Sequence, residues 1–376
     1  TFEYSGNVEF TSIYNSYKYQ NVYGQGSNGQ FDVRASGSWG PKMEGQEVAN
    51  WRNVLYGDPN NRTYKMLPQK DFIEEFYNTG SQINNSIIAS AGGKNARTRL
   101  SFTDSRNKGV TPNHKLDRQY FGVNSEMNND WISVGIKGTY MHEVTRNAPG
   151  MGEYGIMQRF VQMPRSIRLQ DLDHDFIINN RSINWAGPSN ANSNPYSQIM
   201  RENGNESVRD RLMGQASATL TFTDYLKLTG RVSLDMYNDK YRKYVKYLAD
   251  GSNDATQYVQ SRNTTKEFNS DLILSFNKGF GDYDVNANLG TSLYNISHDG
   301  LAGNAGLLQI PLFIYMGNGQ KREASESYSK KEIQSVFFSG SLGYKSMLYL
   351  DVTGRNDWSS TLPKSNRSYF NPSVSL

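Results

Sequence analysis

The chain has 376 residues, a net charge of +4 and 36% hydrophobic residues. No segment approaches the ~18 to 20 consecutive apolar residues that a membrane-spanning helix requires, which excludes a helical membrane protein. The sequence has no cysteine, which excludes disulfides and thiolate metal sites. No stretch dense in lysine and arginine marks a nucleic-acid-binding face, so we expect no nucleic-acid partner.

Segments that alternate between apolar and polar residues recur along the chain, and they predict about a dozen strands. In chain order they cover residues 2–14, 82–90, 96–103, 115–127, 131–144, 208–222, 226–238, 268–277, 283–295, 332–344, 347–353 and a last strand from 369. Short turns between them alternate with long connections, the longest being 15–81 and 145–207. This asymmetry is typical of outer-membrane barrels, with short periplasmic turns and long extracellular loops. Within the second long loop, 157–172 is predicted to hold a short helix.

The two faces of these predicted strands differ in chemistry. A period of two with ionised groups opposite an apolar row predicts that one face touches lipid and the other lines an aqueous bore. The predicted lipid-facing residues are Ile132, Val134, Ile136, Leu220, Leu228, Val232, Leu234, Leu272, Leu274 and Leu289. The predicted lumen-facing residues are Lys137, Lys227, Arg231, Asp235, Asp271 and Asp284. A dry sandwich core has no place for such charges on successive strands.

Several segments resemble the SusC/RagA family of TonB-dependent outer-membrane transporters. They read Y-G-Q-G (23–26), S-W-G-P-K-M-E-G-Q (38–46), N-N-S (84–86), N-K-G-V-T-P-N (107–113), R-N-D-W-S-S-T-L-P (355–363) and S-Y-F-N-P-S-V-S (368–375). The resemblance implies a multi-pass barrel of roughly 22 strands in the bacterial outer membrane, with an N-terminal plug. It also implies energy coupling through TonB and a SusD-like surface lipoprotein as partner.

We expect residues 1–376 to form the N-terminal half of such a barrel, with the plug and the C-terminal half outside this chain. The function implied is active import of a large nutrient, and the residues leave oligosaccharide and oligopeptide open. The alternative from another class is a non-transporting surface β-protein, an adhesin or a carbohydrate-binding sandwich.

Aromatic and polar residues in the predicted loops are candidates for substrate binding, because sugar rings and peptides both stack on aromatic faces. These candidates are Trp39, Trp51, Arg52, Tyr56, Tyr154, Trp185 and Trp358. The alternative is that the rings only pack loops onto one another or onto the lipoprotein. The segment 307–316 is unusually apolar for an external loop and predicts a contact with the plug, another loop or the lipoprotein.

Other motifs in the sequence are weaker indications of function. Gly24, Gly26 and Gly29 match a dinucleotide fingerprint, but no helical period follows them, which favours a loop turn. The segment 171–175 resembles the start of a calcium loop, yet Phe176 and Ser182 replace the required Gly and Glu, which favours a solvated acidic turn. The four histidines lack metal-ligand spacing, and no nucleophile context is present. We therefore expect no enzyme activity, no resident metal and no cofactor.

Overall fold

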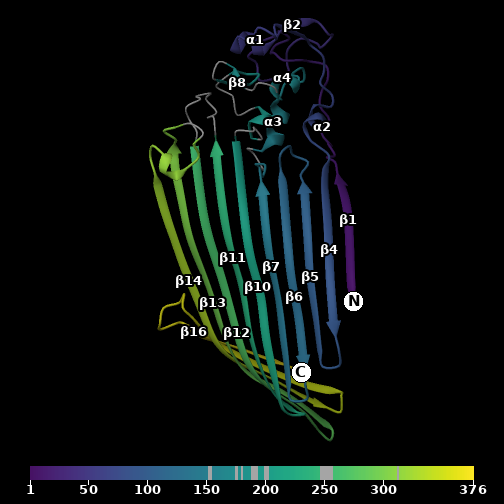
Figure 1. Cartoon of the computed structure of the whole chain (residues 1–376), viewed down its shortest axis with the longest axis vertical. Helices are drawn as coiled ribbons and strands as arrows, with labels where there is room; N and C mark the ends of the chain where they lie inside the picture. The colour runs from purple at the N-terminus through teal and green to yellow at the C-terminus, as the bar shows by residue number, and fades with distance from the viewer. Residues whose placement is uncertain are drawn as a thin grey trace.

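The computed structural model describes residues 1–150, 155–173, 177–178, 181–187, 194–198, 203–245, 257–310 and 313–376. Its main feature is one sheet of 12 antiparallel strands, each hydrogen-bonded to the next along the chain (Figure 1). The strands are β1 (Phe2–Thr11), β4 (Gly80–Gly92), β5 (Ala96–Lys108), β6 (Lys115–Asn128), β7 (Ile132–Arg146), β10 (Asn203–Thr223), β11 (Leu226–Val245), β12 (Gln257–Phe280), β13 (Tyr283–Leu307), β14 (Glu323–Tyr344), β15 (Leu348–Ser359) and β16 (Ser368–Ser375). We call this sheet the wall. The predicted all-β fold, part of a large antiparallel barrel, is confirmed.

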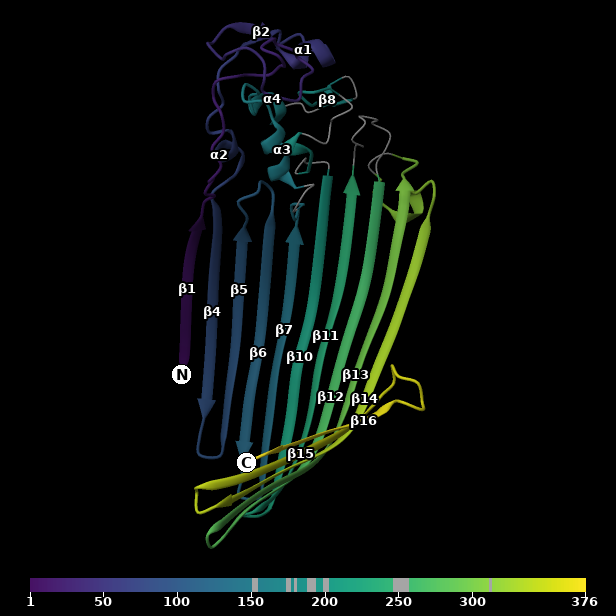
Figure 2. The same cartoon turned by 180° about the vertical axis from the view of Figure 1, so that it is seen from behind.

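The two ends of the wall differ, as predicted. At one end the strands are joined by tight hairpin turns, in which Gly281, Lys345 and Ser346 take the positive φ values that such turns favour. At the other end lie the long connections 12–79 and 147–202, together with shorter ones (Figures 1 and 2). Because each strand reverses direction, every long connection reaches the same end.

Several strands run further toward the loop end than the alternation predicts. The pattern on β11 ends near 238, whereas the strand continues to Val245 and pairs with β12 up to Gln257. Residues 239–245 are polar on both faces, so no alternation marks them as a strand. Ladder hydrogen bonds need no apolar face, which is why the wall extends beyond the alternating part.

The two longest connections fold together beyond the wall, and we call their described residues, within 12–79 and 155–198, the loop body. It contains four short helices, two small hairpins and a 3-10 turn. They are α1 (Trp51–Tyr56), α2 (Phe72–Phe76), α3 (Ile156–Gln162), α4 (Gln170–Asp173), β2 (Glu47–Ala49) with β3 (Thr63–Lys65), β8 (Ile177–Ile178) with β9 (Arg181–Ser182), and η3 (Pro195–Gln198). The helix predicted within 157–172 is divided between α3 and α4. Among the helices in the described part of the chain, none combines the length and the apolar content needed to cross a membrane.

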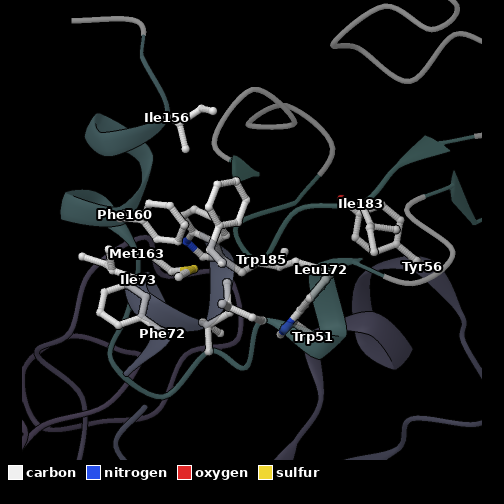
Figure 3. Packing of buried hydrophobic residues seen from close by; sticks show 13 residues of the cluster. Trp51, Tyr56, Phe72, Ile73, Ile156, Phe160, Met163, Leu172, Ile183 and Trp185 are labelled. Atoms are coloured by element: carbon white, nitrogen blue, oxygen red, sulfur yellow. The ribbon is translucent and has the colours of Figure 1, made fainter. Parts of the chain in front are cut away.

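The loop body has a hydrophobic core of its own. Trp51 from the first connection and Phe160 and Trp185 from the second are almost wholly buried within it (Figure 3). The rings of Phe76 and Phe160 meet edge to face with centroids 4.9 Å apart. Side chains from sequence-distant loops thus exclude water from one common centre.

Candidate functional site

The hydrogen-bond register of the wall divides the predicted wall residues between two faces. Leu228 pairs with Leu220 on one side and Leu274 on the other, and Leu274 pairs with Leu289. Paired residues share a face and residues two apart along a strand do so as well. By this rule all ten residues predicted to face lipid lie on one face, and all six predicted to face the lumen lie on the opposite face. We call these the apolar face and the polar face.

The apolar face has no protein layer over it in the described part of the chain. None of its ten predicted residues is buried, and Leu289 is 56% exposed. The two-stranded sheets and the loop-body core lie beyond the loop end of the wall rather than against this face (Figures 1 and 2). A row of exposed aliphatic side chains on this scale requires an apolar environment.

The height of the apolar face matches a membrane. On β11 it extends from Leu226 to Met236, roughly 33 Å at about 3.3 Å per residue. A tilt of about 40° reduces this to about 25 Å, the height of the apolar band on outer-membrane barrels. Just above Met236, the face turns polar along one cross-strand row formed by Gln119, His142, Asp210 and Asn238.

Aromatic residues mark the turn end of the same face. Tyr225 packs edge to face on Phe276, and Tyr283 meets Tyr344 with ring centroids 5.0 Å apart. The ammonium of Lys278 lies 4.3 Å from the centre of the Tyr225 ring. Rings with one wet and one dry end, beside a lysine, are typical of a membrane–water interface.

The polar face carries ion pairs between neighbouring strands. Arg231 bonds Asp271 at 2.7 Å, and Arg211 bonds Asp235 at 2.5 Å. The Tyr237 ring lies beneath the Arg211 guanidinium, 5.9 Å from it. These pairs are half-exposed, so the face suits contact with water or with a polar protein surface, not with lipid.

Four of the predicted substrate-binding residues are buried within the loop body. Trp51, Tyr56, Trp185 and Arg52 are each no more than 4% exposed. The Tyr56 hydroxyl donates to the Asn184 carbonyl across the two connections. Their rings and the guanidinium hold the two connections together, and a role for them in substrate binding stays a prediction.

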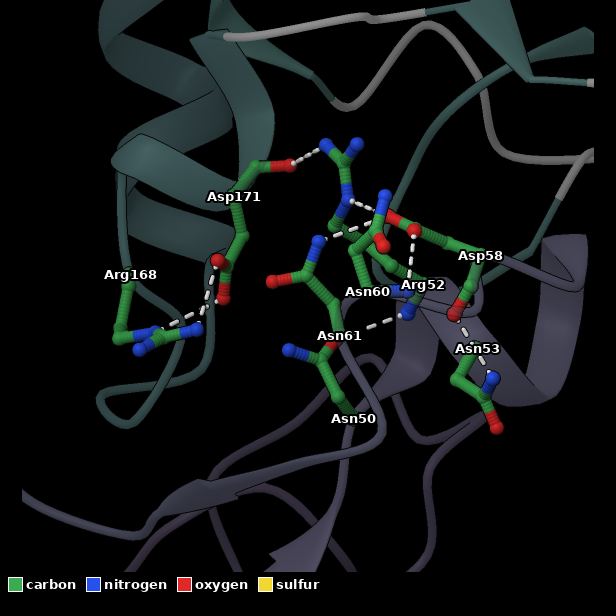
Figure 4. Close-up of polar contacts among 8 residues, drawn as sticks. All are labelled: Asn50, Arg52, Asn53, Asp58, Asn60, Asn61, Arg168 and Asp171. Atoms are coloured by element: carbon green, nitrogen blue, oxygen red, sulfur yellow. Dashed lines mark hydrogen bonds and ion pairs between the residues drawn. The ribbon is translucent and has the colours of Figure 1, made fainter.

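Arg52 is the centre of a polar network that joins both connections (Figure 4). Its Nε donates to Asp58 Oδ2 at 2.8 Å, and its Nη1 donates to the Asp171 carbonyl at 2.7 Å. Burial alone raises the pKa of Asp58, but hydrogen bonds from Arg52, Asn61 and Asn60 outweigh it and hold that pKa below its usual value. The buried charges are therefore paired, as burial requires.

Asp171 is part of this network rather than of a calcium loop. Its carboxylate receives two hydrogen bonds from Arg168, at 2.8 and 2.9 Å. His174 and Asp175, from the same motif, lie outside the described residues. Within the described ranges no group of three acidic or histidine residues is placed to hold a metal ion.

Trp39 differs from the other loop aromatics because it is 69% exposed. It lies on a tightly folded glycine-rich segment, with its ring centroid 6.2 Å from that of Tyr23. A Cβ at Gly40 would lie 2.2 Å from the Gln25 carbonyl oxygen, so the close approach of the two strands depends on this glycine. No helix follows the glycines of 24–29, which agrees with a loop turn. Tyr154 lies outside the described residues.

Trp358 is wrong as a loop residue. It lies in β15, where it pairs with Gln334 on the apolar face of the wall. The sequence misplaced it because the strand continues past 353, where its alternation weakens. This position suits a ring near the edge of the apolar face rather than one that points to substrate.

The described residues of the apolar segment 307–316, which are 307–310 and 313–316, lie at an exposed tip on the β13–β14 connection. Leu308 is buried, whereas Ile310, Phe313 and Tyr315 are all more than half exposed. The side chain of Asn318 fixes the tip by accepting from the Ile310 N–H and donating to the Ile310 and Phe313 carbonyls. Sequence reasoning found the apolar segment but missed Asn318, since a lone asparagine gives no signal in a sequence.

Arg165 is a second residue that the sequence did not single out. It donates to the Gln20 and Gln69 carbonyls, and its guanidinium lies 4.3 Å from the centre of the Phe72 ring. These partners come from two separate parts of the first connection. Arg165 thereby fastens the second connection onto the first.

Comparison with known proteins agrees with this architecture. No family model matches the chain. It is 23% identical over 349 residues to the TonB-dependent receptor P3 of Formosa agariphila, covering 89% of this chain and 33% of that protein. Two solved structures of the RagAB peptide importer, in closed-closed and open-open states, superpose with TM-scores of 0.75, at 15% and 17% identity. Each match covers 99% of this chain and 43% of the solved chain.

The predicted resemblance to SusC/RagA-type TonB-dependent transporters is thus confirmed. The proteins it resembles are described as receptors and importers, not as enzymes. The chain spans about a third of the length of the curated relative, so it corresponds to a part of that protein.

Proposed function

We propose that this chain forms part of the barrel wall and outer vestibule of a TonB-dependent importer in the bacterial outer membrane. The imported nutrient is an oligopeptide or an oligosaccharide, and a SusD-like surface lipoprotein acts with the receptor. The wall separates lipid from an aqueous interior, and the loop body forms one side of the extracellular entrance. TonB acts through a plug inside the barrel.

The observation that carries this proposal is the two-faced wall. One face is a largely apolar band of membrane height that no described part of the chain covers, and the opposite face carries ion pairs. Tight turns at one end and a folded loop body at the other fit a barrel with a short periplasmic and a large external side.

A substrate contact at the entrance is supported best at Trp39. Its ring is exposed on a tightly folded segment, and an exposed rigid ring stacks on a sugar or peptide at low entropic cost. The similarity to the RagAB peptide importer favours a peptide as the imported nutrient.

The alternative, a surface β-sandwich, requires a second sheet packed on the apolar face. The described residues provide only two-stranded hairpins besides the wall, and these lie beyond its end. Extraction of the native protein separates the two functions. A barrel needs detergent and migrates differently on SDS gels before and after boiling, whereas a sandwich is released without detergent.

Deletion of the gene for the full-length receptor tests transport directly. We expect loss of growth on one class of nutrient, peptides or glycans, while growth on monomers of the same class is unchanged. Re-expression of the wild-type receptor restores growth, and a strain without TonB shows the same defect. Unchanged growth on every peptide and glycan tested contradicts the proposal.

A further inference from the structure

The loop-side edge of the apolar face carries a cluster of exposed basic residues. Lys240 on β11 pairs directly opposite Arg262 on β12, and Lys266 on β12 pairs opposite Met236, the last apolar residue of β11. All three share the face of Leu228 and Leu272, because each lies an even number of residues away along its strand. The cluster therefore lies where the apolar band ends.

The positive charges of this cluster are not neutralised by ion pairs. Within the described ranges, neither Lys240, Arg262 nor Lys266 makes an ion pair, unlike most arginines of the wall. Like charges directly opposite each other on adjacent strands are unfavourable unless an anion lies between them.

Carboxylates on the neighbouring strands share this face with the cluster. Asp299 on β13 pairs opposite Thr264, between Arg262 and Lys266. Asp210 lies beside Lys240, but its carboxylate already accepts from the Tyr140 hydroxyl at 2.6 Å and contacts His142 at 2.8 Å. Glu206, on the other side of Lys240, is paired with Arg146 and Arg242, and Glu326 on β14 lies two strands away from Arg262. Among the described residues of the strands next to the cluster, Asp299 is therefore the unengaged acid, and the three basic groups around it leave a net positive site.

An apolar hollow lies below the cluster on the same face. Ala216, Ala218 and Gly230 form its floor, with Ile136, Val232 and Leu272 around them, and its volume is about 680 Å³. The hollow forms because these three residues have little or no side chain, whereas their neighbours are large. A hydrocarbon chain fits such a hollow, and a phosphate bound at the cluster would lie at the headgroup level above it.

We propose that the cluster and the hollow together bind a phosphate-bearing lipid of the outer leaflet, with phosphate on Lys240, Arg262 and Lys266 and an acyl chain against Ala216, Ala218 and Gly230. Amphipathic ligands of this kind match both the charge and the apolar surface. The inference rests on the proposed function, since it requires the apolar face to meet lipid.

The test uses the full-length receptor purified in detergent, with lipid A as the probe and native mass spectrometry as the readout. The triple variant Lys240→Gln, Arg262→Gln, Lys266→Gln is expected to bind lipid A at least 10-fold more weakly. Its matched control, Lys137→Gln with Lys227→Gln, removes lysines from the polar face and is expected to bind as the wild type does. Dephosphorylated lipid A is expected to bind as weakly as the triple variant does.

A second variant tests the site by gain of binding. Asp299→Asn removes the unengaged acid and is expected to strengthen lipid A binding about threefold, even if the triple variant does not assemble. Competition by inorganic phosphate as effective as that by lipid A would show a free-phosphate site and overturn the lipid assignment. Equal binding by the wild type and an assembled triple variant, or an equal loss in the control, would overturn it as well. In each of these cases the proposed function remains supported if the receptor is recovered from outer membranes and migrates differently on SDS gels before and after boiling.

Discussion

The loop body and the wall use similar side chains in opposite ways. In the loop body, Trp51, Phe160 and Trp185 are buried against one another and the charges of Arg52 and Asp58 are buried as a pair. In the wall, large aliphatic residues such as Leu289 are exposed, and ion pairs such as Arg231–Asp271 are half-exposed. The loop body is thus stabilised by its own core, whereas the adjoining wall is stabilised in part by what surrounds it.

This difference indicates what each region depends on. The loop body carries its apolar environment within itself, so its stability is set by packing. The wall depends on strand ladders and on whatever covers its apolar face, which in the proposed function is the lipid of the outer membrane. Substitutions of the same kind are therefore expected to have different effects in the two regions.

The largest effect is expected in the core of the loop body. Phe160→Ala removes a ring that contacts Phe72 and Phe76, and a cavity of this size costs about 3–5 kcal/mol. Limited proteolysis of the receptor in membranes should cut residues 12–79 and 155–198 faster, with the heat-modifiable barrel intact. Leu228→Ala in the wall is the control, since lipid fills the space and the loop body stays resistant. Equal resistance of both variants contradicts a separate core.

Breaking the buried ion pair is expected to cost nearly as much. Asp58→Ala removes the carboxylate that Arg52 bonds inside the loop body, and breaking a buried ion pair in this way costs about 3 kcal/mol. Faster proteolysis of the loop body measures the loss. Asp284→Ala on the polar face of the wall is the control and should leave proteolysis unchanged.

The same pair predicts a dependence on pH. Because the pKa of Asp58 in the folded protein is below its ordinary 3.8, the ionised pair adds stability above that value. That contribution is lost as pH falls through the lower folded value. Protease resistance, assayed with an acid-stable protease, should hold at pH 5 and fall as the pH drops below the ordinary value of 3.8. The Asp58→Asn variant should show no such fall in protease resistance. A fall of the same size in this variant would show that another group is responsible.

Charge on the apolar face is expected to have an intermediate effect. Val232→Arg places a charge near the middle of the band and costs about 2–4 kcal/mol in a bilayer. Ser233→Arg introduces the same side chain on the polar face of the same strand and should cost less than about 1 kcal/mol. Urea unfolding of the receptor in lipid vesicles measures both, and equal costs would contradict the assignment of the two faces.

The smallest effect is expected for the ion pairs of the wall. Arg231→Gln removes a pair in which the arginine side chain is 48% exposed, so the loss is at most about 1 kcal/mol. The urea midpoint in vesicles should shift little and salt should narrow the difference further. A loss of stability as large as that expected for Asp58→Ala would show that water does not reach the polar face.

The sequence predicted the wall far better than the loop body, for a physical reason. Strand alternation is local, so every strand and the division of Leu228 and Arg231 between opposite faces could be found from neighbouring residues. The loop-body core joins Trp51 to Trp185 across more than a hundred residues, and no period marks such a contact. The same limit explains why Trp358 and the far end of β11 were misplaced, because both lie where alternation fades.

The most direct test of the central claim is accessibility on the two faces of β11. A nitroxide spin label attached through Leu228→Cys or Arg231→Cys in the full-length receptor, reconstituted into a bilayer, reports collisions with oxygen and with a water-soluble nickel chelate. We predict that the label at 228 collides often with oxygen and rarely with the nickel chelate, and that the label at 231 does the reverse. Equal ratios at the two positions, or nickel collisions that dominate at 228, would contradict it.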